Sequence, residues 1–351
     1  MKNKLLPAAL LMIALAAVMP PAQAKWVWTP ETGWFRVESV PREAPEEGLE
    51  KAKESYEAGD YKKAQVELQN SLRFAAPDEV REEALFLAAS ASFEAGDIWK
   101  AHHHVLAYWQ AYPKGPHTSQ LVELDYKIAL RLLGGKWGRI YGVPLLPGGI
   151  TGRSVLEKLL DRAPYHPLAD DAQLALGDFY LRRENYPEAK LAYEALVIRY
   201  PQRETAEEAR LMLAVATALD SQGIEYDTGV LQDAAGEFEY FTAIFPNADK
   251  RSVASTMFNR IVTALGRKDL QTGLYYLRTG HRDSAAHYLR SVETRYRGAR
   301  LGDVAFELLG ALESGQSNRH IMSLAKRLNR DLYKERERSE EYEHYLQRLG
   351  L

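Results

Sequence analysis

The most conspicuous candidate for metal chemistry is the run of three histidines from His102 to His104. Imidazole nitrogens bind zinc, but a site needs several ligands that converge on one point. Consecutive side chains of a helix point about 100° apart, so three neighbours on a regular helix do not converge. We therefore expect no metal here and interpret the run as part of a second helix with a partly exposed face, with one imidazole packed against Tyr108 or Phe93.

Other residues that could catalyse a reaction lack the required spacing. Gly134-Gly-Lys136 has neither the upstream glycine nor the Ser or Thr of a phosphate-binding loop. The pairs Asp170-Asp171 and Glu207-Glu208 stand at expected helix starts, where carboxylates stabilise free N–H groups. No His-Glu-x-x-His or Gly-x-Ser-x-Gly motif occurs, and the chain has no cysteine. The sequence predicts a protein that is not an enzyme and has no cofactor.

Charge and the N-terminus bear on partners and location. The 351 residues have a formal net charge of −3, which disfavours nucleic acid as a partner. Lys2 and Lys4 precede an apolar run, and Ala22-Gln23-Ala24 has the form that signal peptidase accepts. We expect residues 1–24 to be removed and the protein to reach the periplasm or the periplasmic face of an outer membrane. How it would stay near a membrane, and its oligomeric state, are left open.

An internal repeat indicates the fold. The ten residues from Ser55 to Ala64 recur from Ser92 to Ala101 with seven identities at a spacing of 37. Weaker copies begin at Gly177 and at Gly273, and all resemble tetratricopeptide repeats, in which two amphipathic helices pack as a hairpin. Gly59 and Gly96 are expected to end first helices in the left-handed conformation. Gly177 and Ala189 are expected at a close contact between two helices, with Tyr180, Tyr193 and Leu196 around it.

The predicted fold class is all-α: a tetratricopeptide-repeat solenoid, a right-handed superhelix of antiparallel helix pairs, with a C-terminal helical extension. Residues 25–45 form an aromatic-rich segment, 46–316 the solenoid and 317–351 a charged C-terminal helix. The apolar stripe Ile321, Leu324, Leu328 and Leu332 leaves two alternatives open, a helix docked on the last repeat or a coiled coil. The six expected pairs are 46–77, 82–113, 118–164, 168–201, 204–246 and 250–297, followed by a closing helix at 300–313.

The later repeats resemble one family. Residues 270–300, with Tyr275-Tyr276 and Ala285-Ala286, resemble the last repeat of the YfiO family of outer-membrane protein assembly factors, the BamD type. Ala206 to Arg210 and Phe245-Pro246 resemble the preceding repeat of that family. The resemblance covers about 168–314 and implies a scaffold that holds a β-barrel insertase and outer-membrane protein substrates. The family carries a lipidated cysteine that this sequence lacks, so lipid anchoring does not carry over.

Two kinds of surface are candidates for binding a protein or peptide partner. The first is the groove lined by the first helices of the pairs, which in solenoids commonly binds peptides. The predicted groove residues are Leu49, Lys53, Tyr56, Phe86, Ser90, Phe93, Leu174, Asp178, Leu181, Leu270, Leu274 and Leu277. The second comprises two apolar segments expected to be exposed, with Trp26, Trp28, Trp34 and Phe35 in one and Val143, Leu145 and Leu146 in the other.

Each apolar segment has an alternative interpretation. The aromatic N-terminal segment could cap the apolar end of the solenoid, and Leu145 and Leu146 could pack between neighbouring pairs. The predicted function is a non-catalytic periplasmic protein-binding scaffold of the BamD type. The alternatives are a tetratricopeptide adaptor of the cell-division or Tol-Pal coordinator type, and an accessory protein of an enzyme.

Overall fold

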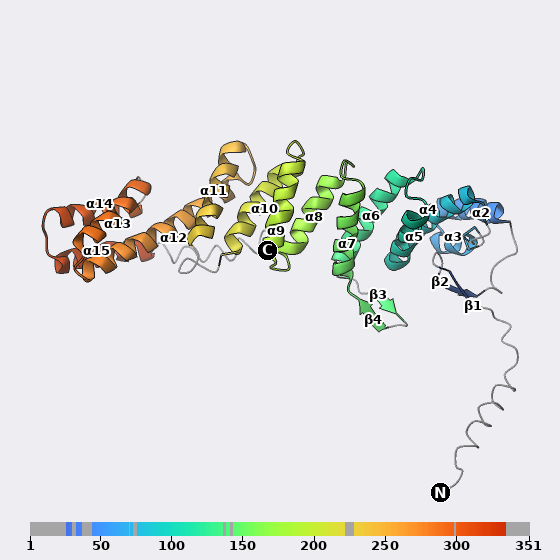
Figure 1. Ribbon diagram of the computed structural model, residues 1–351, viewed down its shortest axis with the longest axis horizontal. Helices are drawn as coiled ribbons and strands as arrows, with labels where there is room; N and C mark the ends of the chain where they lie inside the picture. The colour runs from blue at the N-terminus through green and yellow to red at the C-terminus, as the bar shows by residue number, and fades with distance from the viewer. Residues whose placement is uncertain are drawn as a thin grey trace, which may run out of the picture. The chain divides into compact units, whose positions relative to one another are not determined.

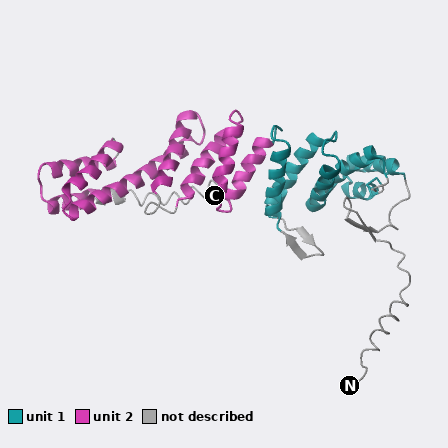
Figure 2. Cartoon of the chain, in the orientation of Figure 1, with its two compact units in different colours: residues 1–168 teal, residues 169–351 magenta. Residues whose placement is uncertain are grey.

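The computed structural model describes residues 26–29, 33–36, 44–69, 71–72, 76–135, 138–140, 143–221, 228–297 and 300–334. The predicted signal peptide and the charged residues 335–351 lie outside the described residues. The chain divides into two compact units, 1–168 and 169–351 (Figure 2). The boundary falls between the third and fourth expected helix pairs, a division that the sequence did not predict.

The described residues of unit 1 form three helix pairs (Figure 1). The helices of each pair pack against each other. The pairs are α2 (Pro45–Glu57) with α3 (Tyr61–Glu67), α4 (Asp78–Glu94) with α5 (Ile98–Ala111), and α6 (Thr118–Leu133) with α7 (Gly148–Arg162). Two short hairpins accompany them: β1 (Trp26–Thr29) with β2 (Gly33–Arg36), and β3 (Gly138–Ile140) with β4 (Val143–Leu146).

Unit 2 contains eight helices among its described residues, and successive helices pack against each other. The last two, α14 and α15, are joined by a short turn and follow three helix pairs (Figure 1). The helices are α8 (Ala169–Leu181), α9 (Tyr186–Arg199), α10 (Thr205–Leu219), α11 (Thr228–Ile244), α12 (Arg251–Arg278), α13 (Arg282–Arg295), α14 (Arg300–Glu313) and α15 (Asn318–Lys334).

The predicted fold class of tetratricopeptide helix pairs is confirmed, but the two hairpins are additions to it. In the first, the backbone of Trp28 pairs with that of Trp34. In the second, β4 occupies part of the insert that we expected to be an exposed loop, and α7 begins at Gly148. Aromatic and β-branched residues favour strands, and the loops between paired strands are short enough for hairpins. The helical repeat pattern does not extend to these segments and so did not reveal them.

One turn recurs between the helices of four pairs. Gly59, Gly96 and Gly280 have positive φ angles of +81°, +82° and +88°, which confirms the prediction for Gly59 and Gly96. In each of the four pairs a backbone N–H just past the first helix donates to a carbonyl five residues back, as in a Schellman motif. The donor and acceptor residues are Asp60 and Ser55 (2.9 Å), Asp97 and Ser92 (2.8 Å), Asn185 and Tyr180 (3.0 Å), and His281 and Tyr276 (2.9 Å).

The close helix contact predicted at Gly177 is present. A Cβ atom added there would lie 2.5 Å from Cε1 of Tyr193, so only glycine fits without a shift. Tyr193 is fully buried, and its hydroxyl donates a 2.7 Å hydrogen bond to Oδ1 of Asp178 on α8. Ala189 and Leu196 are also buried in the same hydrophobic cluster, and Tyr180 packs against it. Small and large residues therefore alternate at this helix contact as the repeat pattern predicts.

The last described helix is docked on unit 2. Ile321, Ala325 and Leu328 of α15 are buried in one hydrophobic cluster with Leu308 and Leu312 of α14. Of the two alternatives for the apolar stripe, the structure therefore shows the docked helix over 318–328. The side chain of Leu332 and the charged residues beyond Lys334 lie outside the described residues.

Candidate partner-binding site

The predicted groove residues lie on the first helices of the pairs, and in each unit we call the surface of these helices the A-face. In unit 1 it is carried by α2 and α4. Nζ of Lys53 on α2 lies 2.9 Å from Glu83 on α4 and 3.0 Å from Glu50. The hydrogen bond to Glu83, followed by that to Glu50, raises the pKa of Lys53. The A-face of unit 1 is thus bridged from one first helix to the next by a charged network.

Aromatic side chains continue the A-face of unit 1. The ring of Phe86 stacks on that of His117, with centroids 4.4 Å apart and planes 12° apart. Ser90 donates a 3.0 Å hydrogen bond to the carbonyl of Phe86, and Phe93 lies further along α4. Phe86, Ser90 and Phe93 are half-buried and keep accessible surface. Tyr56 of α2 is half-buried too, whereas Leu49 is 4% exposed and belongs to the core.

A pocket of about 680 Å³ opens beside this surface, which the sequence did not reveal. Glu82 at its base is buried, accepts a hydrogen bond from the hydroxyl of Tyr108 and lies 3.0 Å from Nδ1 of His117. Burial, then the bond to Glu82, raises the pKa of Tyr108. The turn after α5 also lines the pocket, and Gly115 in this turn leaves room for the hydroxyl of Tyr108. The lining residues are Asp78, Glu79, Glu82, Glu83, Tyr112, Pro113, Lys114, Gly115, Pro116 and His117.

In unit 2 the A-face begins on α8. Leu174 and Asp178 are half-buried, whereas Leu181 is 5% exposed and lies in the core. Burial raises the pKa of Asp178, and the hydrogen bond from Tyr193 opposes this effect. Lys250 bonds Glu208 at 2.7 Å, and the charges of both residues act on Asp178. A mixture of aliphatic and charged groups again lies on the first helices.

On α12 the predicted groove residues are largely covered. Leu270 and Leu277 are 2% and 0% exposed, and Leu274 is half-buried. They pack in the hydrophobic cluster that contains the buried side chains of α15. Nδ2 of Asn318 donates a 2.8 Å hydrogen bond to the carbonyl of Leu277. The chain's own helix α15 therefore packs on the part of α12 that the sequence predicts to bind a peptide.

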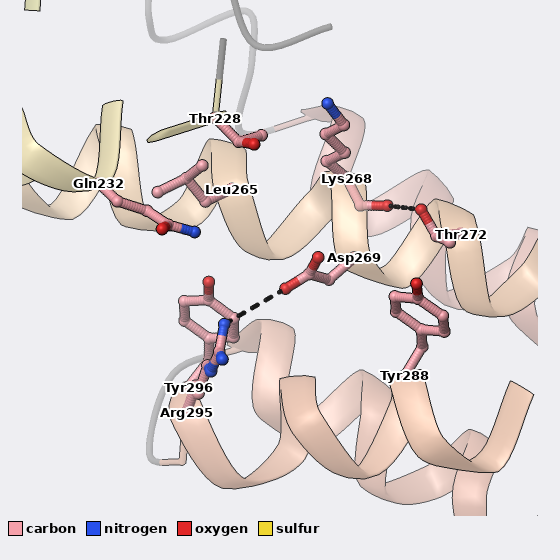
Figure 3. A pocket seen from close by; sticks show the side chains of 9 residues that line it. All are labelled: Thr228, Gln232, Leu265, Lys268, Asp269, Thr272, Tyr288, Arg295 and Tyr296. Atoms are coloured by element: carbon pink, nitrogen blue, oxygen red, sulfur yellow. Dashed lines mark hydrogen bonds and ion pairs between the residues drawn. The ribbon is translucent and has the colours of Figure 1, made fainter. Parts of the chain in front are cut away.

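A second pocket, of about 400 Å³, lies among α11, α12 and α13 (Figure 3). Asp269 points across it toward Arg295, with 3.8 Å between the charged atoms. Thr272 donates a 2.9 Å hydrogen bond to the carbonyl of Lys268, and burial raises the pKa of Tyr296. The sequence did not predict this pocket. Its closest indication was the long segment between the two helices of the fifth expected pair, since Thr228 at the start of α11 lines the pocket. The lining residues are Thr228, Gln232, Leu265, Lys268, Asp269, Thr272, Tyr288, Arg295 and Tyr296.

The histidine run lies on α5. His102 contacts Trp99 edge-on with centroids 6.4 Å apart, and His103 contacts His104 at 6.0 Å. Burial, then the charge of Lys158 and of His103, lowers the pKa of His102 to about 4. The ring neighbour of His102 is thus Trp99, and His104 is the buried member of the run. That one imidazole packs against Tyr108 or Phe93 stays a prediction. Within the described ranges, no group of three His, Cys, Asp or Glu side chains could hold a metal ion.

The predicted exposed segments lie in the two hairpins. Trp26 and Trp28 belong to β1, Trp34 and Phe35 to β2, and Val143, Leu145 and Leu146 to β4. Their backbones pair within each hairpin, and their side chains lie outside the described residues. Among the helices that the structure describes, none combines the length and apolarity needed to span a bilayer.

Residues 151–313 match the model of the YfiO family, described as an outer membrane lipoprotein. The predicted resemblance is confirmed over this range, which covers the second helix of the third pair, the three pairs of unit 2 and α14. The chain is thus a tetratricopeptide-repeat protein that resembles the YfiO or BamD family. No curated protein matches the chain.

Several solved structures are similar to the chain. One is a tetratricopeptide repeat protein from Parabacteroides merdae, at 16% identity over 77% of this chain and 98% of that one, with a TM-score of 0.38. Another is PilW, a type IV pilus biogenesis factor, at 16% identity over 75% and 98%, with a TM-score of 0.31. A third is a signal transduction ATPase with a tetratricopeptide repeat sensor from Pyrococcus horikoshii, at 14% identity over 87% and 43%, with a TM-score of 0.31.

Proposed function

We propose that this protein is a non-catalytic, periplasmic protein-binding scaffold of the BamD type, which helps to insert β-barrel proteins into an outer membrane. The observation that carries the proposal is the YfiO match over 151–313, which falls on stacked tetratricopeptide pairs. The signal-peptide pattern of residues 1–24 supports a location at the periplasmic face of the outer membrane. The partners are a β-barrel insertase and segments of its substrates.

The A-face is the surface proposed to bind these polypeptides. In unit 1 it offers the half-buried aromatic rings of Phe86 and Phe93 and the ion pair of Lys53 and Glu83. Aromatic and aliphatic groups bury the apolar side chains of a bound segment, and neighbouring charges fix its register. The aromatic residues of β1 and β2 and the apolar residues of β4 are proposed as further partner contacts.

A charge reversal tests this surface. Lys53→Glu places a third carboxylate beside Glu50 and Glu83 on the A-face, so capture of the β-barrel insertase from a detergent extract of envelopes should fall several-fold. Lys63→Glu is the matched control, because Lys63 lies on α3 and its side chain is 62% exposed. It should capture the insertase as the native chain does. Equal capture by both variants would place the partner surface elsewhere, and no capture by the native chain would contradict the proposed function.

A further inference from the structure

The last repeat of unit 2 already has a helix on its A-face. The buried side chains Ile321, Ala325 and Leu328 of α15 lie in the same cluster as Leu270 and Leu277 of α12. Helix α15 packs on both α12 and α14. At the end of α12, Nδ2 of Asn318 on α15 donates a 2.8 Å hydrogen bond to the carbonyl of Leu277, so α15 reaches the part of α12 that carries the predicted peptide-binding leucines.

The buried positions of α15 have the spacing of a helix bound in a groove. Ile321, Ala325 and Leu328 stand at i, i+4 and i+7, which places them on one stripe, as in complexes where an amphipathic helix fills an apolar groove. Met322 and Leu324 flank this stripe and are partly buried. The remaining described positions point outward and are polar or basic: Arg319, His320, Ser323, Lys326 and Arg327 are all exposed.

Polar contacts hold α15 at its first turn. Nη2 of Arg282 donates a 2.9 Å hydrogen bond to the carbonyl of Leu312, and its Nη1 donates to the carbonyl of Gln316 at 3.0 Å and to Oδ1 of Asn318. Asn318 in turn donates to the carbonyl of Leu277. Beyond that turn, the contacts described for α15 are apolar, and apolar contacts of this kind can be made equally by another helix of the same pattern.

We propose that the A-face of α12, together with the side of α14 on which α15 packs, is a binding surface for amphipathic helices and that α15 is its intramolecular occupant. The helix that fits has apolar residues at i, i+4 and i+7 and a basic or polar outer face. A partner helix with this pattern competes with α15, so α15 regulates access to the A-face of unit 2. The proposal rests on the proposed function in one respect, namely that the A-face is the surface where partners bind.

Binding of a separate peptide tests whether another helix can replace α15 on this surface. Ile321→Asp in the full chain puts a carboxylate at a position that is 0% exposed, which releases α15. A fluorescent peptide with the sequence of residues 318–334 should then bind the variant, measured by anisotropy, and bind the native chain at least tenfold more weakly. The same peptide carrying Ile321→Asp should bind neither chain.

Two further variants keep the test decisive. Ser323→Asp adds the same charge to the exposed side of α15 and should behave as the native chain. Asn318→Ala removes the hydrogen bonds of this side chain with Leu277 and Arg282 and leaves the apolar stripe unchanged. It should admit the peptide to an intermediate extent, so it decides the matter if Ile321→Asp loses its helical circular dichroism. Failure of the peptide to bind any folded variant, or equal binding to the native chain, overturns the proposal. This outcome is independent of the insertase capture, which uses no peptide and alters only unit 1.

Discussion

At the scale of single residues, the recurring turn allows the energetic effect of a left-handed backbone to be measured without a change in side-chain packing. Gly96 has φ +82°, and no atom lies within 4 Å of the point that a Cβ would occupy, so replacing it changes only the backbone preference. Gly96→Ala should lower the free energy of unfolding by about 1 kcal/mol, because the left-handed conformation is unfavourable for residues with a Cβ. Urea unfolding followed by circular dichroism measures this change.

Glu184 provides the control, since it occupies the corresponding position between α8 and α9 with φ +58°. Both Glu and Ala have a Cβ, so Glu184→Ala should change the free energy of unfolding by less than about 0.5 kcal/mol. An equal loss in Gly96→Ala and Glu184→Ala would contradict the assignment of the effect to the left-handed backbone.

Gly177 tests close packing between helices. Gly177→Ala brings a methyl group against the ring of buried Tyr193 and should destabilise the fold by about 1–3 kcal/mol. Gly236 lies within α11 with nothing within 4 Å of an added Cβ, so Gly236→Ala should stabilise the fold by about 0.5–1 kcal/mol through helix propensity. The two melting temperatures should therefore move in opposite directions; a shift of the same sign would refute the contact.

The shifted pKa values of Asp125 and His102 lead us to expect an unusual dependence of the free energy of unfolding on pH. Asp125 is 4% exposed and accepts a 2.8 Å hydrogen bond from Nε1 of Trp109, yet burial raises its pKa to about 6. Its contribution to stability is complete below its ordinary pKa of 3.8 and is lost as pH rises through 6. The pKa of His102 is lowered to about 4, so its contribution is present above pH 6.5 and is lost as pH falls toward 4. Between pH 4 and 6 the two effects oppose each other.

Asp125→Asn removes the contribution of Asp125 to the pH dependence and leaves that of His102. At pH 7.5 the variant should be more stable than the native chain by about 1–3 kcal/mol, because a buried carboxylate is replaced by a neutral amide. Between pH 6 and 4 its stability should fall relative to that of the native chain by about 1.4 kcal/mol per pH unit. Urea midpoints measured across this range check both statements, and parallel profiles for the two proteins would argue against them.

At the scale of elements, much of the fold could be predicted because each helix pair repeats the same packing requirement. The two glycines at a spacing of 37 and the close contact at Gly177 follow from backbone conformation and van der Waals contact, which one sequence reveals. The two hairpins depend on pairing between short segments and leave no periodic signal. The packing of α15 on α12 depends on contacts between residues far apart in the chain, such as Asn318 with Leu277, which the sequence does not indicate.

The candidate site was predictable only in part. Leu49 and Leu181 have the register of groove residues but are buried in the core, and Leu270 and Leu277 are buried in the cluster that α15 joins. A leucine on a first helix faces either the groove or a neighbouring helix. If the repeat pattern is aligned with the sequence one residue too early or too late, a core leucine is predicted to face the groove. Lys53, Phe86 and Asp178 keep accessible surface. Each contacts a charged or aromatic partner, namely Glu83, His117 and Tyr193. Residues from several helices and from turns line the two pockets. The repeat pattern does not predict where such pockets form.

At the scale of the whole molecule, export of the chain is the first requirement of the proposed function. The signal-peptide pattern predicts a mature chain that begins at Lys25 and carries a formal charge more negative than −3, because the removed segment has two lysines and no acid. N-terminal sequencing of the protein from a periplasmic fraction should therefore begin at Lys25. A chain that retains Met1 would contradict a cleaved signal.

The central claim is that the A-face holds polypeptides of outer-membrane assembly, and photo-crosslinking in living cells tests it most directly. A photoreactive residue at Ser90, which is half-buried on the A-face of unit 1, should give a crosslink to a β-barrel insertase or to its unfolded substrates. The same residue at Gln110, exposed near the end of α5, should not. Crosslinks to these proteins from Gln110 but not from Ser90, or from neither position, would contradict the account.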